Sequence, residues 1–194
     1  MSSSSNVIQI KVTLTETNPV IWRQILVPAT ISFFNLHHII QISMGWKNYH
    51  LFEFAIGDYR IGFIDDEPED SDSIADSKKV TIDLLLTKEK FVFKYIYDFG
   101  DSWVHSVEVE KIDEEIRDKI YPVCIDGNFN CPPEDCGGIP GYYNLLNILR
   151  NKNDPEYKDM KNWVGRRYDP EKLNLNNINK ELPKFREYDK DWEK

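Results

Sequence analysis

The 194-residue sequence lacks the features that would predict a membrane or secreted protein. No apolar run approaches the roughly 20 residues that a helix needs to cross a bilayer. The first residues are serine-rich and have neither the charged region nor the apolar stretch of a secretory signal. We therefore expect a cytoplasmic protein that does not associate with a membrane.

Cysteine is scarce, and its spacing lacks the close pairs that are typical of a zinc knuckle. The three cysteines are Cys124, Cys131 and Cys136, which leaves no C-x2-C pair. An odd number of cysteines favours reduced thiols over a disulfide framework. Three thiolates and a distant histidine would still suffice for a tetrahedral metal site. We expect instead that the thiols pack in or beside a loop, and we predict no cofactor.

Basic residues are outnumbered, with 24 lysines and arginines against 33 acids and a net charge of −9. Because phosphate contacts require lysine and arginine, this balance argues against a general nucleic-acid-binding protein. Six acids crowd into residues 65–72, which predicts a solvated loop. A calcium loop would need a regular D-x-D-x-D-G spacing that is absent there. DNA association remains a third hypothesis only for the basic residues Arg150, Lys152, Lys158, Lys161, Arg166 and Arg167.

The pattern of apolar residues predicts one α+β domain. Hydrophobic residues make up 41% of the chain, which is long enough to bury a full core. Alternating segments predict strands over 7–14, 20–27, 51–56, 59–64, 91–97 and 103–110. Helical spacing predicts helices over 32–44, 142–149, 155–165 and 175–182. This order favours an antiparallel sheet with helices packed on one side, over 7–182, with an acidic loop inserted at 65–78 and flexible tails at 1–6 and 183–194.

Four segments rich in uncommon residues carry a family resemblance. They read NPVIWRQILVP at 18–28, LHHIIQISMGW at 36–46 with HLFEF at 50–54, YIYDFGDSWVH at 95–105, and YPVCIDG at 121–127 with CPPEDCGG at 131–138. Together they resemble the Ri-plasmid open-reading-frame-three-like family, whose members are often labelled insertion-element passenger proteins of TnpR type. The resemblance covers about residues 7–182. It implies an α+β domain with a curved antiparallel β-sheet, and it implies no settled activity.

The hairpin turn after residue 97 holds the first candidate site residues. Asp98 and Asp101 flank a glycine in the turn, and Trp103 and His105 face the same side of the strand that follows. Aspartates in such a turn commonly accept local backbone hydrogen bonds. Alternatively, one of them orients His105 or shares a cation with it. A site that also includes His50 requires the two strands to be neighbours.

The loop over residues 131–141 is the second candidate, because prolines stiffen it and it leads into a helix N-terminus. Glu134 or Asp135 either caps that helix or lines a ligand pocket with Tyr142. A third feature is the adjacent pair His37 and His38 on the first expected helix. Neighbouring helical residues point about 100° apart, so we expect one of them to be packed and the other to lie at the surface.

These observations predict a non-enzymatic binding or accessory domain associated with mobile elements. We expect a protein, a peptide or a small ligand as its partner, and no direct DNA binding. The expected pocket consists of Asp98, Asp101, Trp103, His105, His50, Glu134, Asp135 and Tyr142. The alternative is a divalent-metal-dependent hydrolase or nuclease-like enzyme in which Asp98, Asp101 and His105 hold the ion and activate water. The weaker metal candidates are Cys124, Cys131 and Cys136.

Overall fold

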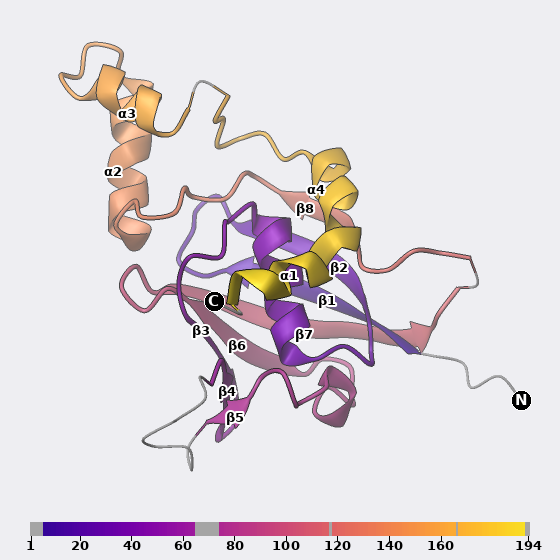
Figure 1. Cartoon of the computed structure of the whole chain (residues 1–194). Helices are drawn as coiled ribbons and strands as arrows, with labels where there is room; N and C mark the ends of the chain where they lie inside the picture. Colours follow the sequence, from indigo (N-terminus) through magenta and orange to yellow (C-terminus); the bar gives the residue numbers. More distant parts are fainter. Residues whose placement is uncertain (1–5, 65–73, 117, 166, 193–194) are drawn as a thin grey trace, which may run out of the picture.

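In the described part of the chain, eight strands form one open sheet in the order β5-β4-β3-β6-β7-β1-β2-β8 (Figure 1). The computed structural model describes residues 6–64, 74–116, 118–165 and 167–192. Neighbouring strands are antiparallel except for the short parallel pair β4 and β5. The strands are β1 (Asn6–Leu14), β2 (Ile21–Pro28), β3 (Phe52–Ile56), β4 (Tyr59–Gly62), β5 (Ala75–Asp76), β6 (Val92–Tyr97), β7 (Trp103–Glu114) and β8 (Val123–Asn128).

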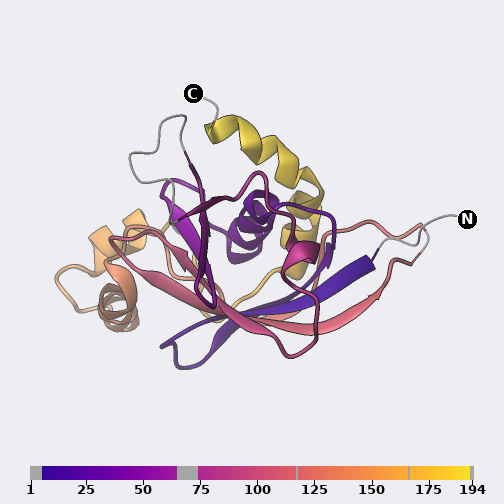
Figure 2. The ribbon, with the colours of Figure 1, turned by 90° about the horizontal axis from the view of Figure 1, so that it is seen from below.

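The sheet curves and packs one face against the helices (Figure 2). Along β1, β2 and β7, buried residues alternate with half-exposed ones, as expected for strands with one face on the core. The predicted α+β class and the antiparallel character of the sheet are therefore confirmed. The β6–β7 hairpin pairs Tyr97 with Trp103, which places the turn residues 98–102 at one end of the sheet.

Helix α1 (Phe33–Met44) lies against the concave face of the sheet (Figure 2). The side chain of Ser32 accepts a hydrogen bond from the backbone N–H of Asn35 and caps the first turn. Gly45 ends the helix with a φ of 89°, a left-handed conformation that glycine adopts without a steric penalty. The predicted boundaries of this helix are close to those observed.

Both histidines of α1 are buried, so the expectation that one lies at the surface is wrong. His37 and His38 are each 0% exposed. The reason is that α1 is covered on two sides, by the sheet and by the helical C-terminal segment (Figure 2). The ring of His38 lies 6.1 Å from that of Tyr188 in this segment. A helix covered on both sides buries residues that point in different directions.

The segment after residue 182, expected to be a tail, forms the 3-10 helix η2 (Leu182–Trp192). It continues from α4 (Leu175–Glu181) and packs on α1. Leu182 is 0% exposed and Phe185 is 5% exposed, because both side chains enter the core. The short 3-10 turn η1 (Ile82–Leu84) likewise buries Ile82.

Helices α2 (Gly138–Arg150) and α3 (Tyr157–Trp163) lie beside the sheet near the β6–β7 turn (Figure 1). The expected N-terminal tail and most of the acidic loop, residues 1–5 and 65–73, lie outside the described residues. Among the residues that are described, no helix combines the length and apolar character needed to cross a bilayer.

Candidate functional site

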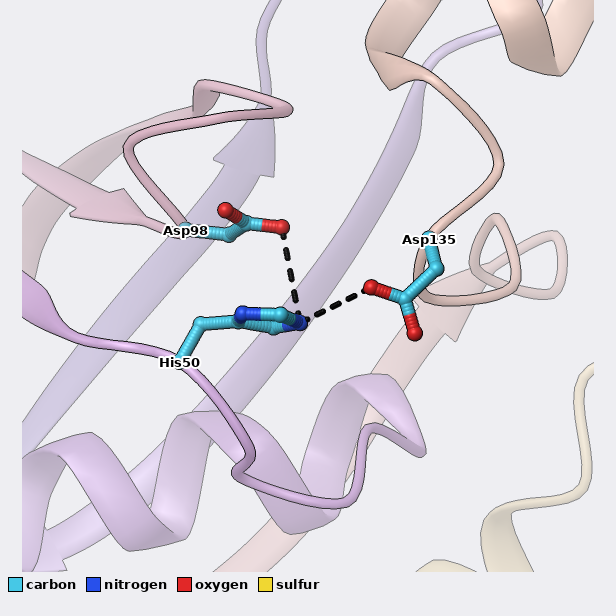
Figure 3. A group of neighbouring side chains, drawn as sticks. All are labelled: His50, Asp98 and Asp135. Carbon is cyan, nitrogen blue, oxygen red and sulfur yellow. Dashed lines mark hydrogen bonds and ion pairs between the residues drawn. The ribbon is translucent and has the colours of Figure 1, made fainter.

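Three side chains from separate parts of the sequence meet at the surface between the β6–β7 turn and the loop that precedes α2. They are His50, Asp98 and Asp135 (Figure 3). The Nε2 atom of His50 lies 3.0 Å from Oδ1 of Asp135 and 3.6 Å from Oδ2 of Asp98. Within the described residues, this is the one group of three histidine, cysteine or acidic side chains whose ligand atoms gather within 4.8 Å.

Asp98 is positioned by hydrogen bonds to the backbone, and its two carboxylate oxygens have different contacts. Its backbone has a φ of 57°, and its Oδ1 accepts a 2.9 Å hydrogen bond from the N–H of Gly100. Its own N–H donates to the carbonyl of Leu51, next to His50 in the chain. The predicted turn role of Asp98 is therefore observed, and Oδ2 is left to face His50.

Asp135 is positioned through its neighbour Glu134. The Oε1 of Glu134 accepts a hydrogen bond from the hydroxyl of Tyr97 at 2.5 Å, and Oε2 accepts one from the N–H of Lys47 at 2.8 Å. Burial and the adjacent carboxylate raise the pKa of Tyr97, so its hydroxyl keeps its proton and remains a donor. The loop is thus anchored to β6 and to the chain after α1, while Asp135 itself is exposed.

The geometry of the cluster suits a divalent cation. Zinc lies about 2.0–2.2 Å from nitrogen and oxygen ligands, which places neighbouring ligand atoms roughly 3–3.5 Å apart. The two distances from His50 are close to that range, and the 3.0 Å contact with Asp135 equally has the geometry of a hydrogen bond. One imidazole and two carboxylates form a mixed nitrogen and oxygen set, which suits zinc, manganese or iron better than calcium. The half-exposed His50 and exposed Asp135 leave the site open to solvent.

His105 and Trp103, both predicted for this site, lie in the core instead. Each is 0% exposed, and Nδ1 of His105 faces the carbonyl of Tyr95 at 3.3 Å. The ring of His105 packs edge-on against Trp46 at 5.3 Å. Burial lowers the pKa of His105 to about 4, so it is neutral at pH 7. Alternation along β7 does place both residues on one side, and that side is the core face.

The structure also separates Asp101 and Tyr142 from the cluster. The Oδ2 of Asp101 accepts a 3.1 Å hydrogen bond from the N–H of Gly137, so Asp101 contacts the start of α2. Glu134 and Asp135 were the residues expected either to cap this helix or to line a pocket, and the observed contact with its start comes from Asp101 instead. Tyr142 is 4% exposed and belongs to the core. Asp98, Asp101 and His105 accordingly form no group with metal-binding geometry among the described residues.

The three cysteines form no metal group either. All three belong to the described residues, and their sulfur atoms are absent from the one group that gathers within 4.8 Å. Burial raises the pKa of Cys124 to about 11 and that of Cys131 and Cys136 to about 12. The thiols are therefore protonated at pH 7. Cys131 and Cys136 lie in the loop before α2, as expected, whereas Cys124 is buried in strand β8.

A cavity and several exposed apolar side chains adjoin the cluster. The cavity has a volume of about 360 Å³, and its walls include Trp46, Lys47, Glu134 and Asp135. Three large side chains flank the cluster in sequence and are more than half exposed, namely Tyr49 at 68%, Leu51 at 51% and Phe99 at 57%. Exposed apolar groups beside polar ligands are typical of a binding surface.

Arg23 is a further candidate functional residue that was not predicted from the sequence. Its side chain is 0% exposed. In β2 the residues Ile21, Arg23, Ile25 and Val27 all face the core. The signal was present in the sequence, because this alternation places an arginine at an inward position of an apolar strand.

The fold and the site define a class: a single α+β domain with an eight-stranded sheet and an open histidine–aspartate cluster at one end. Residues 6–177 match the plasmid pRiA4b ORF-3-like proteins, and the chain belongs to that family. This confirms the resemblance carried by the four sequence segments.

Two similar proteins extend over most of the chain. One is the uncharacterized protein y4hQ of Sinorhizobium fredii, which is 34% identical over 179 residues and covers 91% of this chain and 90% of its own. The other is the crystal structure of a protein of unknown function, MM3350 from Methanosarcina mazei Go1. It has a TM-score of 0.80 and 33% identity, and the match covers 90% of this chain and 98% of that one. Neither name assigns an activity.

Proposed function

We propose that this protein is a non-enzymatic accessory domain that binds its partner through a divalent cation held by His50, Asp98 and Asp135. The observation that carries the proposal is the convergence of three ligand atoms within 4.8 Å from three separate segments. The plasmid origin in the family description supports the association with mobile elements.

The chemistry of the cluster requires His50 to bind through an unprotonated Nε2, with the proton on Nδ1. Two carboxylates then balance the charge of a divalent ion. Three protein ligands leave further coordination positions for water or for an oxygen atom of the partner. Zn²⁺ and Mn²⁺ fit this mixed donor set.

The surface around the cluster favours a peptide or small molecule with an apolar part. Tyr49, Leu51 and Phe99 would contact that part, while the cation binds an oxygen atom of the same ligand. Direct DNA binding is not expected, because the net charge of −9 would repel phosphate.

A second candidate function is metal-dependent hydrolysis at the same cluster. The cavity of about 360 Å³ favours it, because Asp135 is both a wall of the cavity and a ligand of the proposed cation. Water on the ion would then be the nucleophile. The catalytic set would be His50, Asp98 and Asp135 rather than Asp98, Asp101 and His105.

Titration calorimetry of the metal-free protein with Zn²⁺ and with Mn²⁺ tests the proposal. We expect one equivalent to bind, and we expect His50→Ala and Asp135→Asn each to weaken binding by at least about tenfold. Asp58→Asn is the matched control, because Asp58 is an exposed aspartate in the β3–β4 turn, outside the cluster. Equal affinity in the Asp135→Asn and Asp58→Asn proteins would overturn the proposal. Turnover of a phosphodiester by the metal-loaded protein, lost in Asp135→Asn, would favour the hydrolase.

A further inference from the structure

Arg23 places a cationic side chain in the interior of the protein, on the core face of β2. Its side chain is 0% exposed, between Ile21 and Ile25 on the same face of the strand. Transfer of an isolated charge into a protein interior is unfavourable by several kcal/mol unless it is paired and hydrogen-bonded. The hydrogen-bond and ion-pair partners of this guanidinium therefore show whether its charge is neutralised within the protein.

The hydrogen bonds of Arg23 go to neutral backbone carbonyls. Its Nε donates to the carbonyl of Ser43 at 2.8 Å, and its Nη1 donates to the carbonyls of Trp22 and Asn128 at 2.8 and 3.0 Å. These bonds join the last turn of α1 to β2 and β8. The helix C-terminus contributes a partial negative charge, but none of the three partners carries a full one.

No carboxylate balances this charge among the residues that the structure describes, since Arg23 forms no ion pair there within 4.0 Å. The nearby thiols of Cys124 and Cys131 do not supply an anion either. Burial raises the pKa of both thiols above 10 in spite of the guanidinium, so both are neutral at pH 7. Within the described part of the chain, the positive charge of Arg23 therefore has no counter-ion.

Arg23 is one of the residues that line a cavity of about 610 Å³, and further residues of the lining are positively charged. The walls include Arg167 and Lys172, both exposed and without an ion pair among the described residues, and one acid, Asp169. Three cations against one acid make this cavity positive, although the whole chain has a net charge of −9. A volume of this size accommodates a small metabolite.

We propose that this cavity binds a small molecule through a phosphate or carboxylate group, with Arg167 and Lys172 as direct contacts and Arg23 as a fixed positive charge buried behind its wall. This site is separate from the proposed cation cluster, and neither residue set includes a member of the other. Arg23 has no solvent-exposed surface, so its charge acts on the cavity through the intervening protein atoms and not by direct contact. The bound anion supplies a counter-ion that the described residues do not provide.

Gly127 supports the position of Arg23. A Cβ atom at Gly127 would lie 2.8 Å from the carbonyl oxygen of Trp22, 2.9 Å from Cδ2 of Leu173 and 3.1 Å from Cδ of Arg23. A residue without a side chain is thus required for the Arg23 stem and Leu173 to pack against β8. Leu173 is itself a wall of the same cavity.

The test is titration calorimetry with inorganic phosphate and with succinate, at constant ionic strength and with a chelator present to exclude metal-mediated binding. We expect one of the two anions to bind with one equivalent. We expect Lys172→Glu and Arg167→Glu to weaken that binding at least about tenfold, because each variant reverses a charge at the direct contact. Lys152→Glu makes the same change of net charge at an exposed position that does not line the cavity, and we expect its affinity to stay within about twofold of the parent.

Arg23→Lys and Arg23→Gln test whether the positive charge of Arg23 contributes to anion binding. The lysine variant keeps the positive charge and should retain most of the affinity, whereas the glutamine variant should lose at least about fivefold. If Arg23→Gln does not fold, the Lys172 and Arg167 variants decide the proposal. No saturable binding of either anion up to about 10 mM, or equal weakening by Lys172→Glu and Lys152→Glu, would overturn it. The chelator keeps this result independent of the cation site.

Discussion

The phenol of Tyr97 donates a 2.5 Å hydrogen bond to Oε1 of Glu134, 37 residues later in the chain. The same hydroxyl accepts a 3.0 Å hydrogen bond from the backbone N–H of Tyr49. One side chain on β6 therefore anchors two segments, the residue before His50 and the residue before Asp135. The arrangement of His50 and Asp135 therefore depends on this hydroxyl, although Tyr97 is not part of the cluster.

We expect Tyr97→Phe to lower the free energy of unfolding by about 1–3 kcal/mol, because it removes a hydrogen bond to a charged group and leaves Glu134 with one partner fewer. Urea unfolding followed by circular dichroism measures this change. Tyr59→Phe is the control, because Tyr59 is 65% exposed and also loses only a hydroxyl. Tyr97→Phe should also weaken metal binding, and equal stability of the two variants would contradict the anchoring role.

The stability of the protein should fall as the pH is lowered from about 6.5 to 4. Burial lowers the pKa of His38 and of His105 to about 4, whereas the unfolded chain protonates histidine near pH 6.5. In that interval the unfolded state binds protons that the folded state does not, so the free energy of unfolding decreases with falling pH. Each histidine contributes up to about 3 kcal/mol.

The measurement is urea unfolding at pH 7, 5.5 and 4.5 for the parent protein and for His105→Gln. We expect a smaller decrease for the variant, since glutamine does not titrate. Carboxylates titrate equally in both proteins, so the difference between the two reports His105 alone. Parallel stability curves for parent and variant would show that His105 is not buried in its neutral form.

All three cysteines should resist alkylation in the folded protein. With a pKa of about 11 for Cys124 and about 12 for Cys131 and Cys136, only about 0.1% or less of each thiol is ionised at pH 8. We expect iodoacetamide to modify the native protein at least about 100-fold more slowly than the protein in urea. Mass spectrometry of tryptic peptides distinguishes the three sites, and rapid native labelling of Cys131 would contradict its burial.

The C-terminal 3-10 helix should contribute to stability. Phe185→Ala removes a ring that is 5% exposed and packed in the core, and we expect a loss of about 3–5 kcal/mol. Phe99→Ala is the matched control, because the ring of Phe99 is 57% exposed. Thermal unfolding of both variants tests this difference. A similar melting temperature for the two variants would show that the segment after residue 182 does not contribute to the stability of the fold.

Much of the fold follows from local patterns in the sequence. Alternation over 7–14 and 20–27 predicts the strands that are observed as β1 and β2, and helical spacing over 32–44 predicts the helix observed as α1. These signals are local, because a strand or a helix cap depends on residues a few positions apart. The expectation for His37 and His38 was wrong since the pattern within one helix does not report a second layer that covers it.

The candidate site followed from the sequence only in part. His50, Asp98 and Asp135 were all predicted for the pocket, but the functional alternative for the turn paired Asp98 or Asp101 with His105. The pairing of β3 with β6 decides this point, because it places Leu51 against Asp98 and so brings His50 to the turn. Strand order is a non-local property, and a single sequence does not contain it.

The sequence by itself determined the family, the residue types that carry chemistry, and most of the helices and strands, but not β8 or η2. The tertiary structure alone decided which of those residues meet, that Asp98 faces His50 while His105 is buried, and that Arg23 lines a cavity without an ion-pair partner among the described residues. The physical reason is the separation along the sequence of the residues that interact. Helix and strand signals arise between near neighbours, whereas a site arises from side chains that only the packing of the whole sheet brings together.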